Sequence, residues 1–595
     1  MGRAAQAGRN IMTQGDGALV AARGVPAIQL IAAAILVFLV LTQGISAPFQ
    51  KDAEPQSAQW IVSMVRDANW FNPRDYYGFV ERKPPLYYWL SALASKATGG
   101  RVDETRARIV SVVSATVIAL EVLGWTASEI GVAEGWLALL FILGIYGFSS
   151  RATLALTDML MVALLMSAWL VAYPIFGGEV SGSRICAAGG LLGLGVVTKG
   201  PVVLILAVFA GLLFVAFERD RARPLLRIVW PVVAIAATIG AIWYTPWLVI
   251  GGRPEVRIFL HENLGHFIPA SLGGTGEASR PFWEIAARLI GGANPLILLM
   301  PATLAGFATG EITTRQRKPL VFQASLVAAV VIFFSLASAK RDDYILPALP
   351  GVAILSAAAF GMKEPTGGYP GGAKIRDGVS ALIGFAALLA VALALATARR
   401  NLQLTLQSSD EALMTILERG IATRSPPFMI FLGISAAAAV AAFVFLVRRS
   451  TILVGAMIGV ISFVGVFLID TFVRPELARS RSYKSFLVQV RERIDGHPQF
   501  VVHDADFDLA FYYGALVPPL VFEKGLPPAI EKEPAAAPSG AYLIARDRDL
   551  TMLPDSYRGR IRLVERSNIS GAEGPPALYV IEPTAGLKSD RGIAR

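Results

Sequence analysis

Apolar runs of membrane-spanning length recur along most of this chain, separated by short polar turns. A helix needs about 20 apolar residues to cross a bilayer, and by this criterion we count about thirteen spans. They lie near residues 25–47, 106–127, 131–149, 154–176, 183–198, 201–217, 226–250, 284–309, 319–338, 344–361, 376–398, 427–447 and 451–472. The pattern predicts a polytopic α-helical membrane protein with about 13 transmembrane helices.

Short basic loops set the expected orientation of these spans. Arginine and lysine gather at 219–227, 315–318 and 448–449, as cytoplasmic loops do under the positive-inside rule. The first apolar run is longer than the core of a signal peptide, so we expect a retained first helix with a cytoplasmic N-terminus. Residues 48–105 then lie outside, and we expect two interfacial helices there.

The chain becomes more polar after Asp470. Strand-like apolar runs occur at 499–503, 520–523, 541–545, 560–564 and 577–581, and helix-like segments at 483–494 and 507–513. Short strands mixed with helices predict a small α/β domain. We therefore expect a transmembrane domain over 1–474, with interfacial helices in 48–105, and an extracytoplasmic α/β domain over 475–595.

Composition agrees with a membrane protein. The chain is 54% hydrophobic and 16% charged, against about a quarter charged residues in soluble domains. Its net charge of +10 fits basic cytoplasmic loops and contact with anionic membrane lipids. We expect no nucleic-acid partner, since no basic low-complexity arm is present. Cys186 is the only cysteine, which excludes an intrachain disulfide.

Three acidic residues are candidates for catalysis. Asp52 and Glu54 follow the first span in Lys51-Asp-Ala-Glu-Pro55, where a carboxylate close to apolar surface can have a raised proton affinity. No structural partner for either is visible in the sequence. Asp158 lies at the outer end of an apolar span, and intramembrane acids are functional candidates. A purely structural pair with Arg151 is the alternative for Asp158.

Six cations fall on the outer face, against the usual charge bias. They are Arg82, Lys83, Arg151, Lys199, Lys340 and Arg341. Arginine and lysine form charge-assisted hydrogen bonds with phosphate, so an anionic ligand would explain them; snorkelling or helix capping is the alternative. Lys199 lies in Thr198-Lys-Gly-Pro201, which predicts a helix break that lines a cavity. A possible structural divalent metal has only weak candidate ligands in Glu81, His261 and His266, the last two in an expected outer loop at 251–283.

Several short motifs occur in the same order as the motifs of a known family. They are Asp52–Glu54, Lys83-Pro-Pro-Leu-Tyr-Tyr-Trp-Leu90, Leu156-Thr-Asp-Met159, Leu194-Gly-Val-Val-Thr-Lys-Gly-Pro201, Tyr244-Thr-Pro-Trp247 and Tyr344-Ile-Leu-Pro-Ala-Leu-Pro350. The chain resembles the C-type glycosyltransferases that use polyprenyl-phosphate sugars, specifically the protein O-mannosyltransferase and lipid A aminoarabinose transferase relatives. The resemblance covers roughly residues 25–480.

This resemblance implies inverting transfer of a sugar from a polyprenyl-phosphate donor to a lipid, glycan or protein acceptor. The reaction would take place at the outer face of a bacterial inner membrane and would require no cofactor. Asp52 or Glu54 would activate the acceptor, with Asp158 as a further catalytic residue. The donor phosphate would be held by Lys83, Arg82, Arg151, Lys199, Lys340, Arg341 and Tyr344.

Two departures from the family pattern limit this transfer of roles. The acids are split as Asp52-Ala-Glu54, which leaves open which of them is catalytic. The outer loop reads His261-Glu-Asn-Leu-Gly-His-Phe267 where the family often has Glu-His-Asn-Leu-Gly-Arg-Phe, which weakens any metal site there.

A membrane transporter or flippase for a lipid-linked or anionic solute is the alternative function. Such transporters often contain inverted repeats and bind their substrates near the midplane of the bilayer. We find no convincing internal repeat, and the candidate charges cluster at one face. The sequence therefore favours the transferase.

Overall fold

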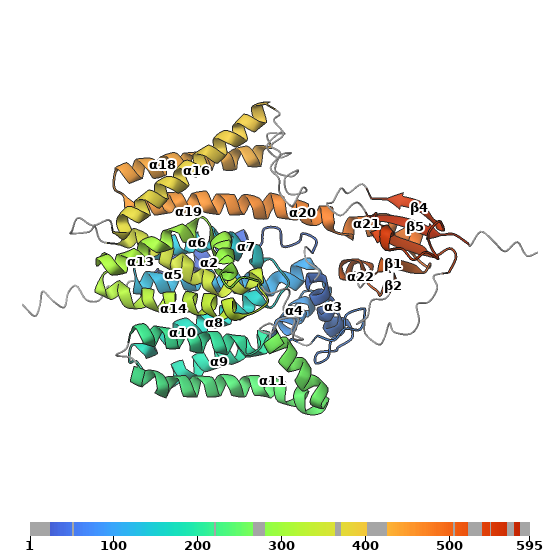
Figure 1. Ribbon diagram of the computed structural model, residues 1–595, viewed down its shortest axis with the longest axis horizontal. Coiled ribbons are helices and arrows are strands. Elements are labelled where there is room, and N and C mark those ends of the chain that lie inside the picture. The colour runs from blue at the N-terminus through green and yellow to red at the C-terminus, as the bar shows by residue number, and fades with distance from the viewer. Residues whose placement is uncertain are drawn as a thin grey trace, which may run out of the picture.

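A helical bundle forms one end of the molecule and a small sheet forms the other (Figure 1). The computed structural model describes residues 24–49, 53–81, 83–218, 222–265, 280–362, 371–400, 425–503, 506–521, 538–547, 549–567 and 576–583. Three of the predicted site residues, Asp52, Arg82 and His266, lie outside these ranges.

Each of the thirteen predicted apolar segments coincides with one helix or with a run of two or three short helices. The bundle contains α2 (Ala27–Leu41), α5 (Glu104–Glu129), α6 (Val132–Leu143), α7 (Tyr146–Ala152), α8 (Asp158–Phe176), α9 (Gly182–Lys199), α10 (Val202–Phe217), α11 (Ala222–Leu264), α12 (Glu284–Ala293), η4 (Leu296–Leu299), α13 (Met300–Thr309), α14 (Thr314–Leu336), η5 (Asp342–Ala348), α15 (Leu349–Ala358), η6 (Ala359–Gly361), α16 (Gly372–Arg400), α18 (Pro426–Val447) and α19 (Thr451–Leu468).

Not all of these helices are long enough to cross a membrane alone. Among the described residues, eight helices have the length and apolar character of a span, or up to ten if each bent pair forms one span. The bent pairs are α6 with α7, at 66°, and α12 with the η4–α13 segment, at 104°. The helical membrane fold is thus confirmed, while the count of 13 spans stays a prediction.

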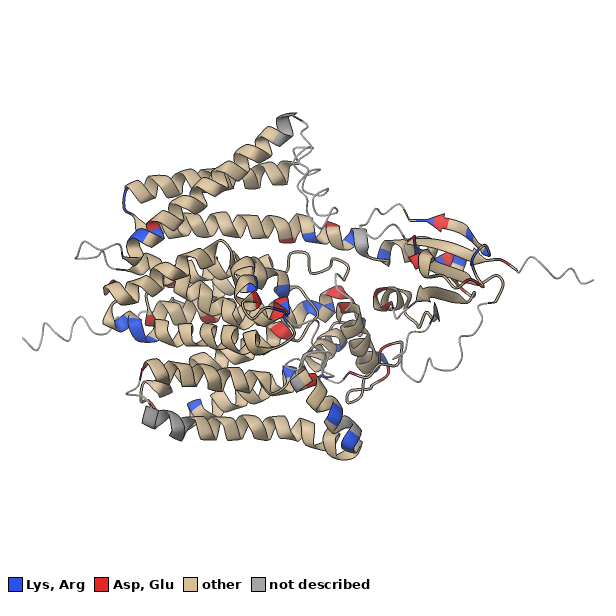
Figure 2. Cartoon of the chain, in the orientation of Figure 1, with Lys and Arg blue, Asp and Glu red and all other residues tan. Residues whose placement is uncertain are grey.

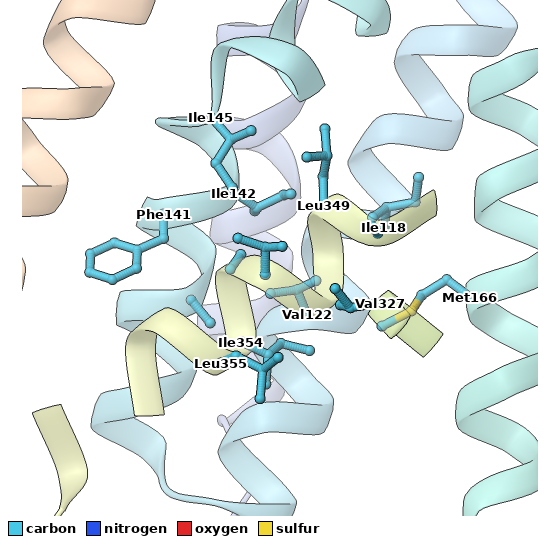
Figure 3. Packing of buried hydrophobic residues seen from close by; sticks show 14 of the residues in the cluster. Ile118, Val122, Phe141, Ile142, Ile145, Met166, Val327, Leu349, Ile354 and Leu355 are labelled. Carbon is cyan, nitrogen blue, oxygen red and sulfur yellow. The ribbon is translucent and has the colours of Figure 1, made fainter. Parts of the chain in front are cut away.

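The segment η5–α15 forms the centre of the bundle. All ten residues of α15 are buried, and its leucine and isoleucine side chains meet those of α5, α6 and α14 (Figure 3). By contrast, α18 buries only four of its 22 residues. A helix that is apolar all round but largely uncovered is stable when lipid surrounds it, so α18 lies at the periphery.

The segment 48–105 contains two helices, as predicted. These are α3 (Ala53–Arg66) and α4 (Leu86–Ala97). The rings of Trp60 and Tyr88 meet edge to face with centroids 5.6 Å apart. The Tyr87 hydroxyl donates a hydrogen bond to the Ala107 carbonyl at 2.8 Å, which ties α4 to α5. Tyr87 and Tyr88 are therefore packing residues, and both are fully buried.

One predicted loop is helical over its first part. We expected residues 251–283 to form an outer loop, but α11 continues to Leu264. The chain turns at Gly252, whose φ of 64° favours glycine, and the helix then resumes. His261 therefore lies on a helix and is exposed.

The C-terminal segment forms the predicted α/β unit. After π-helical η7 (Ile469–Val473) and α20 (Arg474–Arg481) come α21 (Lys484–Ile494), β1 (Gln499–His503), α22 (Phe507–Tyr513), β2 (Pro519–Val521), β3 (Tyr542–Arg546), η8 (Asp549–Met552), β4 (Ile561–Arg566) and β5 (Pro576–Ile581). The sheet order is β2-β1-β3-β5-β4. Strand β1 is parallel to β2 and β3, and β5 is antiparallel to β3 and β4.

This unit contacts α3, Phe49 and α5 through α22. The Gln59 amide of α3 donates to the Phe507 carbonyl at 2.9 Å. The Tyr512 hydroxyl accepts a hydrogen bond from the Phe49 amide at 3.1 Å and donates to Glu104 at 2.8 Å. The sheet unit is therefore fixed to the segment that precedes the candidate acids.

Candidate functional site

Two cavities of different character meet at the end of the bundle that faces the C-terminal sheet. One, of about 130 Å³, is lined by four cations and two carboxylates together with several apolar side chains, and α7, α8, α9 and η5 contribute to it. The other, of about 490 Å³, is lined mainly by apolar and aromatic side chains of α10, α11 and α14. Both are lined by Lys83, Lys199, Asp343 and Tyr344. A ligand with a charged head and an apolar tail could therefore occupy both cavities at once.

The polar cavity carries an excess of positive charge. Its lining includes the cations Lys83, Arg151, Lys199 and Arg341, and only two carboxylates, Asp158 and Asp343. Acidic and basic residues gather at this end of the bundle, facing the C-terminal sheet (Figure 2). Two surplus positive charges in a partly enclosed space favour an anionic group with two negative charges.

Lys199 is placed by the predicted helix break. It is the last residue of α9, and Gly200 follows with a φ of 90°. A Cβ on Gly200 would lie 2.9 Å from Asn263 Oδ1 and 3.2 Å from the Tyr244 hydroxyl oxygen, so only glycine fits this turn. The Lys199 amino group forms an ion pair with Asp158 and lies 3.7 Å from Asp343 Oδ2.

Arg151 remains partly unsatisfied. It lies on α7, and its Nη1 donates to the Ser150 hydroxyl at 3.2 Å. Its Nε is buried and donates no hydrogen bond to any described residue. The suggested pair between Arg151 and Asp158 is not formed, because Asp158 pairs with Lys199. Arg151 therefore brings an unused donor to the lining of the polar cavity.

Lys340 departs from the predicted phosphate cluster. Its amino group donates to the carbonyl oxygens of Ser335 at 2.6 Å and Phe334 at 3.3 Å, and also to that of Ala337. These are carbonyls at the C-terminal end of α14, where a cation is favourable. Lys340 lines neither cavity. We therefore interpret Lys340 as a helix cap and not as a phosphate ligand. Helix capping was the alternative interpretation for the six cations of the sequence analysis.

Glu54 has a partner that the sequence did not reveal. It is fully buried, and Arg108 of α5 donates to its two oxygens at 2.9 and 3.1 Å. The Ala155 amide donates to Glu54 Oε1 at 2.9 Å. Arg108 also donates to the carbonyl oxygens of Ala47 at 2.5 Å and Pro48 at 3.2 Å. Glu54 therefore has a structural partner, although none was visible in the sequence.

The larger cavity has the lining of a site for a hydrocarbon chain. Pro201 and Ile205 come from the α9–α10 break and α10, and Tyr244 and Trp247 from α11. Tyr344 lines both cavities and stacks on Phe334 with centroids 4.3 Å apart. Apolar pockets with a few convergent polar groups are typical of ligand sites.

The weak metal candidates do not form a cluster in the described part of the chain. No group of three or more histidine, cysteine, aspartate or glutamate residues there could hold a metal ion. Burial raises the pKa of the Glu81 carboxyl to about 7. Its Oε1 accepts a hydrogen bond from the Lys83 amide at 2.6 Å. Because His266 lies outside the described residues, a metal role for these residues stays untested.

Two site residues were missed by sequence reasoning. Asp343 forms an ion pair with Lys199 and accepts a hydrogen bond from Arg341 Nε at 3.3 Å. Arg108 anchors Glu54. Both were visible as charges close to apolar runs, and an ionisable residue in a span is a functional candidate. What the sequence lacked was the identity of their partners.

The chain has known relatives in both sequence and structure. It is 26% identical over 316 residues to the undecaprenyl phosphate-α-4-amino-4-deoxy-L-arabinose arabinosyl transferase of Enterobacter sp.. It is 28% identical over 316 residues to that of Erwinia tasmaniensis. These matches cover 51% of this chain, and the chain spans about half, 52%, of the length of these curated relatives. No protein-family model matches the chain.

The structural match extends over nearly the whole molecule. The crystal structure of ArnT from Cupriavidus metallidurans bound to undecaprenyl phosphate superimposes with a TM-score of 0.68, at 17% identity, over 94% of this chain and 99% of the other. The chain has the C-type glycosyltransferase fold. The apo form of ArnT gives a TM-score of 0.65 and covers 93% of this chain and 97% of the other.

These matches confirm the resemblance drawn from the sequence motifs. They support the aminoarabinose transferase side of that resemblance. None of the relatives named here is a mannosyltransferase, so the comparisons give no support to that part of the expectation. The roles of individual residues are not decided by similarity at this level.

Proposed function

We propose that this protein transfers a sugar, a pentose of the aminoarabinose type, from a polyprenyl-phosphate donor to an acceptor at the outer face of a bacterial inner membrane. The observation that carries the proposal is the junction of the cationic polar cavity with the apolar cavity, through Lys83, Lys199, Asp343 and Tyr344. A lipid phosphate has this division into an anionic head and a hydrocarbon tail. The relatives described above are named for such a donor.

In this proposal the cations offset the charge of the leaving phosphate. The acceptor attacks the anomeric carbon, the bond between that carbon and the phosphate oxygen breaks, and the electron pair leaves with the lipid phosphate. Lys83, Arg151, Lys199 and Arg341 stabilise the developing charge. Asp158 and Asp343 orient Lys199 through their ion pairs. Substitution from the side opposite the phosphate inverts the anomeric carbon.

We assign the proton-accepting role to Asp52 and an anchoring role to Glu54. Glu54 is already engaged by Arg108 and the Ala155 amide, so a free carboxylate for the acceptor proton has to come from elsewhere. Asp52 directly precedes Ala53, which lines the polar cavity. A base placed beside the acceptor contributes about 10²–10⁴-fold to the rate. Asp52→Asn should therefore lower turnover by about 10²-fold or more.

The test is release of free lipid phosphate by the detergent-solubilised protein. Wild type would be incubated with undecaprenyl-phosphate aminoarabinose and lipid A, with undecaprenyl-phosphate mannose as the control donor. The proposal predicts release of undecaprenyl phosphate that depends on the acceptor and is lost in Asp52→Asn. Movement of the intact donor across the liposome membrane without cleavage would favour a flippase and contradict the proposal. Release from the mannose donor alone would contradict the assignment of a pentose.

A further inference from the structure

The helix that leaves the bundle contains a π-helical turn with a buried ion pair. Helix α19 passes into η7 (Ile469–Val473) before α20 begins at Arg474. Arg474 Nη1 donates to Asp470 Oδ1 at 2.9 Å, and the exposed fractions of the two side chains are 9% and 10%. π-helical turns inside helices frequently occur at functional sites. The buried charges need further partners for their remaining donors and acceptors.

Those partners lie on α7, the short helix that carries Arg151. The Ser149 hydroxyl donates to Asp470 Oδ2. Arg474 Nη2 donates to the Ser150 carbonyl at 2.9 Å. Both serines are buried and directly precede Arg151. The ion pair therefore holds α7 at two consecutive residues beside the guanidinium that enters the polar cavity.

The same turn also contacts the chain that leads to the acidic motif. Gly44 has a φ of 73°, and a Cβ at this position would lie 3.0 Å from the Asp470 carbonyl oxygen. The loop after α2 thus packs directly on the backbone of η7. One element therefore supports both the cationic and the acidic side of the candidate site.

We propose that Asp470 and Arg474 are positioning residues for the lipid phosphate. They fix α7 so that Arg151 faces the polar cavity, and they act on the ligand only through Arg151. This inference rests on the proposed function and adds to it two residues that touch neither cavity. A merely structural pair would contribute to stability without any coupling to Arg151.

A double-mutant cycle distinguishes these two roles. The affinity for undecaprenyl phosphate would be measured in detergent for the wild-type protein and for the single variants Ser149→Ala, Asp470→Asn and Arg151→Gln. It would also be measured for two double variants, Ser149→Ala/Arg151→Gln and Asp470→Asn/Arg151→Gln. Residues that share one network typically couple, so Ser149→Ala and Asp470→Asn should each weaken binding about three- to thirtyfold. In the Arg151→Gln background neither should weaken it further. Ser149→Ala removes one hydroxyl and is the milder test if Asp470→Asn does not fold.

Arg376→Gln is the matched control. Arg376 is a buried arginine on α16 that pairs with Asp377 at 2.7 Å and donates to the Ala359 carbonyl at 3.4 Å. It lines neither cavity, so its substitution should lower thermal stability and leave affinity unchanged.

Each other outcome counts against a specific part of the proposal. Wild-type affinity in folded Ser149→Ala and Asp470→Asn, or losses that add fully to that of Arg151→Gln, would overturn the positioning role and leave the proposed function intact. A wild-type protein that binds no undecaprenyl phosphate would overturn both.

Discussion

Glu54→Gln should destabilise the protein because it leaves Arg108 buried without its counter-charge. The exposed fractions of the two side chains are 1% for Arg108 and 0% for Glu54. Removing one partner of a buried ion pair costs about 3–5 kcal/mol, because the remaining charge is uncompensated. A glutamine can still accept the hydrogen bond from the Ala155 amide, so this hydrogen bond contributes little to the loss of stability. The expected effect is a clearly lowered temperature of thermal unfolding in detergent.

A second substitution should reverse much of this loss. In Glu54→Gln/Arg108→Gln no unpaired charge remains, so the double variant should be more stable than either single variant. Glu476→Gln is the control: Glu476 pairs with Arg479 at the surface, with side chains 50% and 60% exposed, and such pairs contribute about 0–1 kcal/mol. If Glu54→Gln unfolds at the wild-type temperature and has lost turnover, the anchoring role is refuted. The proton-accepting role would then belong to Glu54.

Two further predictions concern charges at other positions. Lys199→Ala should weaken undecaprenyl-phosphate binding by roughly tenfold or more. Lys340→Ala should instead lower thermal stability and leave the affinity unchanged, because Lys340 caps α14. Equal effects of the two substitutions on affinity would contradict this assignment. Burial raises the pKa of the Asp508 carboxyl to about 8, so the folded state holds a proton that the unfolded state releases near pH 4, and stability should fall as the pH rises from about 4 to 8. Native-state hydrogen exchange of β1 and β3 in the full-length protein, corrected for intrinsic rates, should report this loss of stability. The pH dependence should be absent in Asp508→Asn.

Local patterns predicted the elements well because each is encoded by neighbouring residues. The apolar run at 499–503 coincides with β1 (Gln499–His503), and proline at 84–85 precedes α4 at Leu86. The prediction of a loop at 251–283 was wrong for residues 251–264, because a second helical segment follows the turn at Gly252. Hydropathy counts apolar residues and does not report such a turn.

The candidate site was predicted only in part, since its partners are distant in the sequence. Lys199 and Asp158 were both identified as candidates, but their ion pair joins two helices. The pair between Glu54 and Arg108 likewise connects residues 54 positions apart. Lys340 and Lys199 look alike in the sequence, and only the fold directs one to helix carbonyls and the other to the cavity. Side-chain identity indicated the chemistry, and packing decided which residues share a site.

Photocrosslinking can show whether a lipid phosphate occupies both cavities. An undecaprenyl phosphate with a diazirine in its first isoprene unit would be bound to the purified protein, irradiated, and located by mass spectrometry of the labelled peptides. We expect that it does, with labelling of peptides that contain Tyr244, Phe334 or Tyr344, which line the apolar cavity, and with competition by unlabelled undecaprenyl phosphate. Labelling confined to the peripheral helices α16 and α18, or labelling that unlabelled lipid does not reduce, would contradict it.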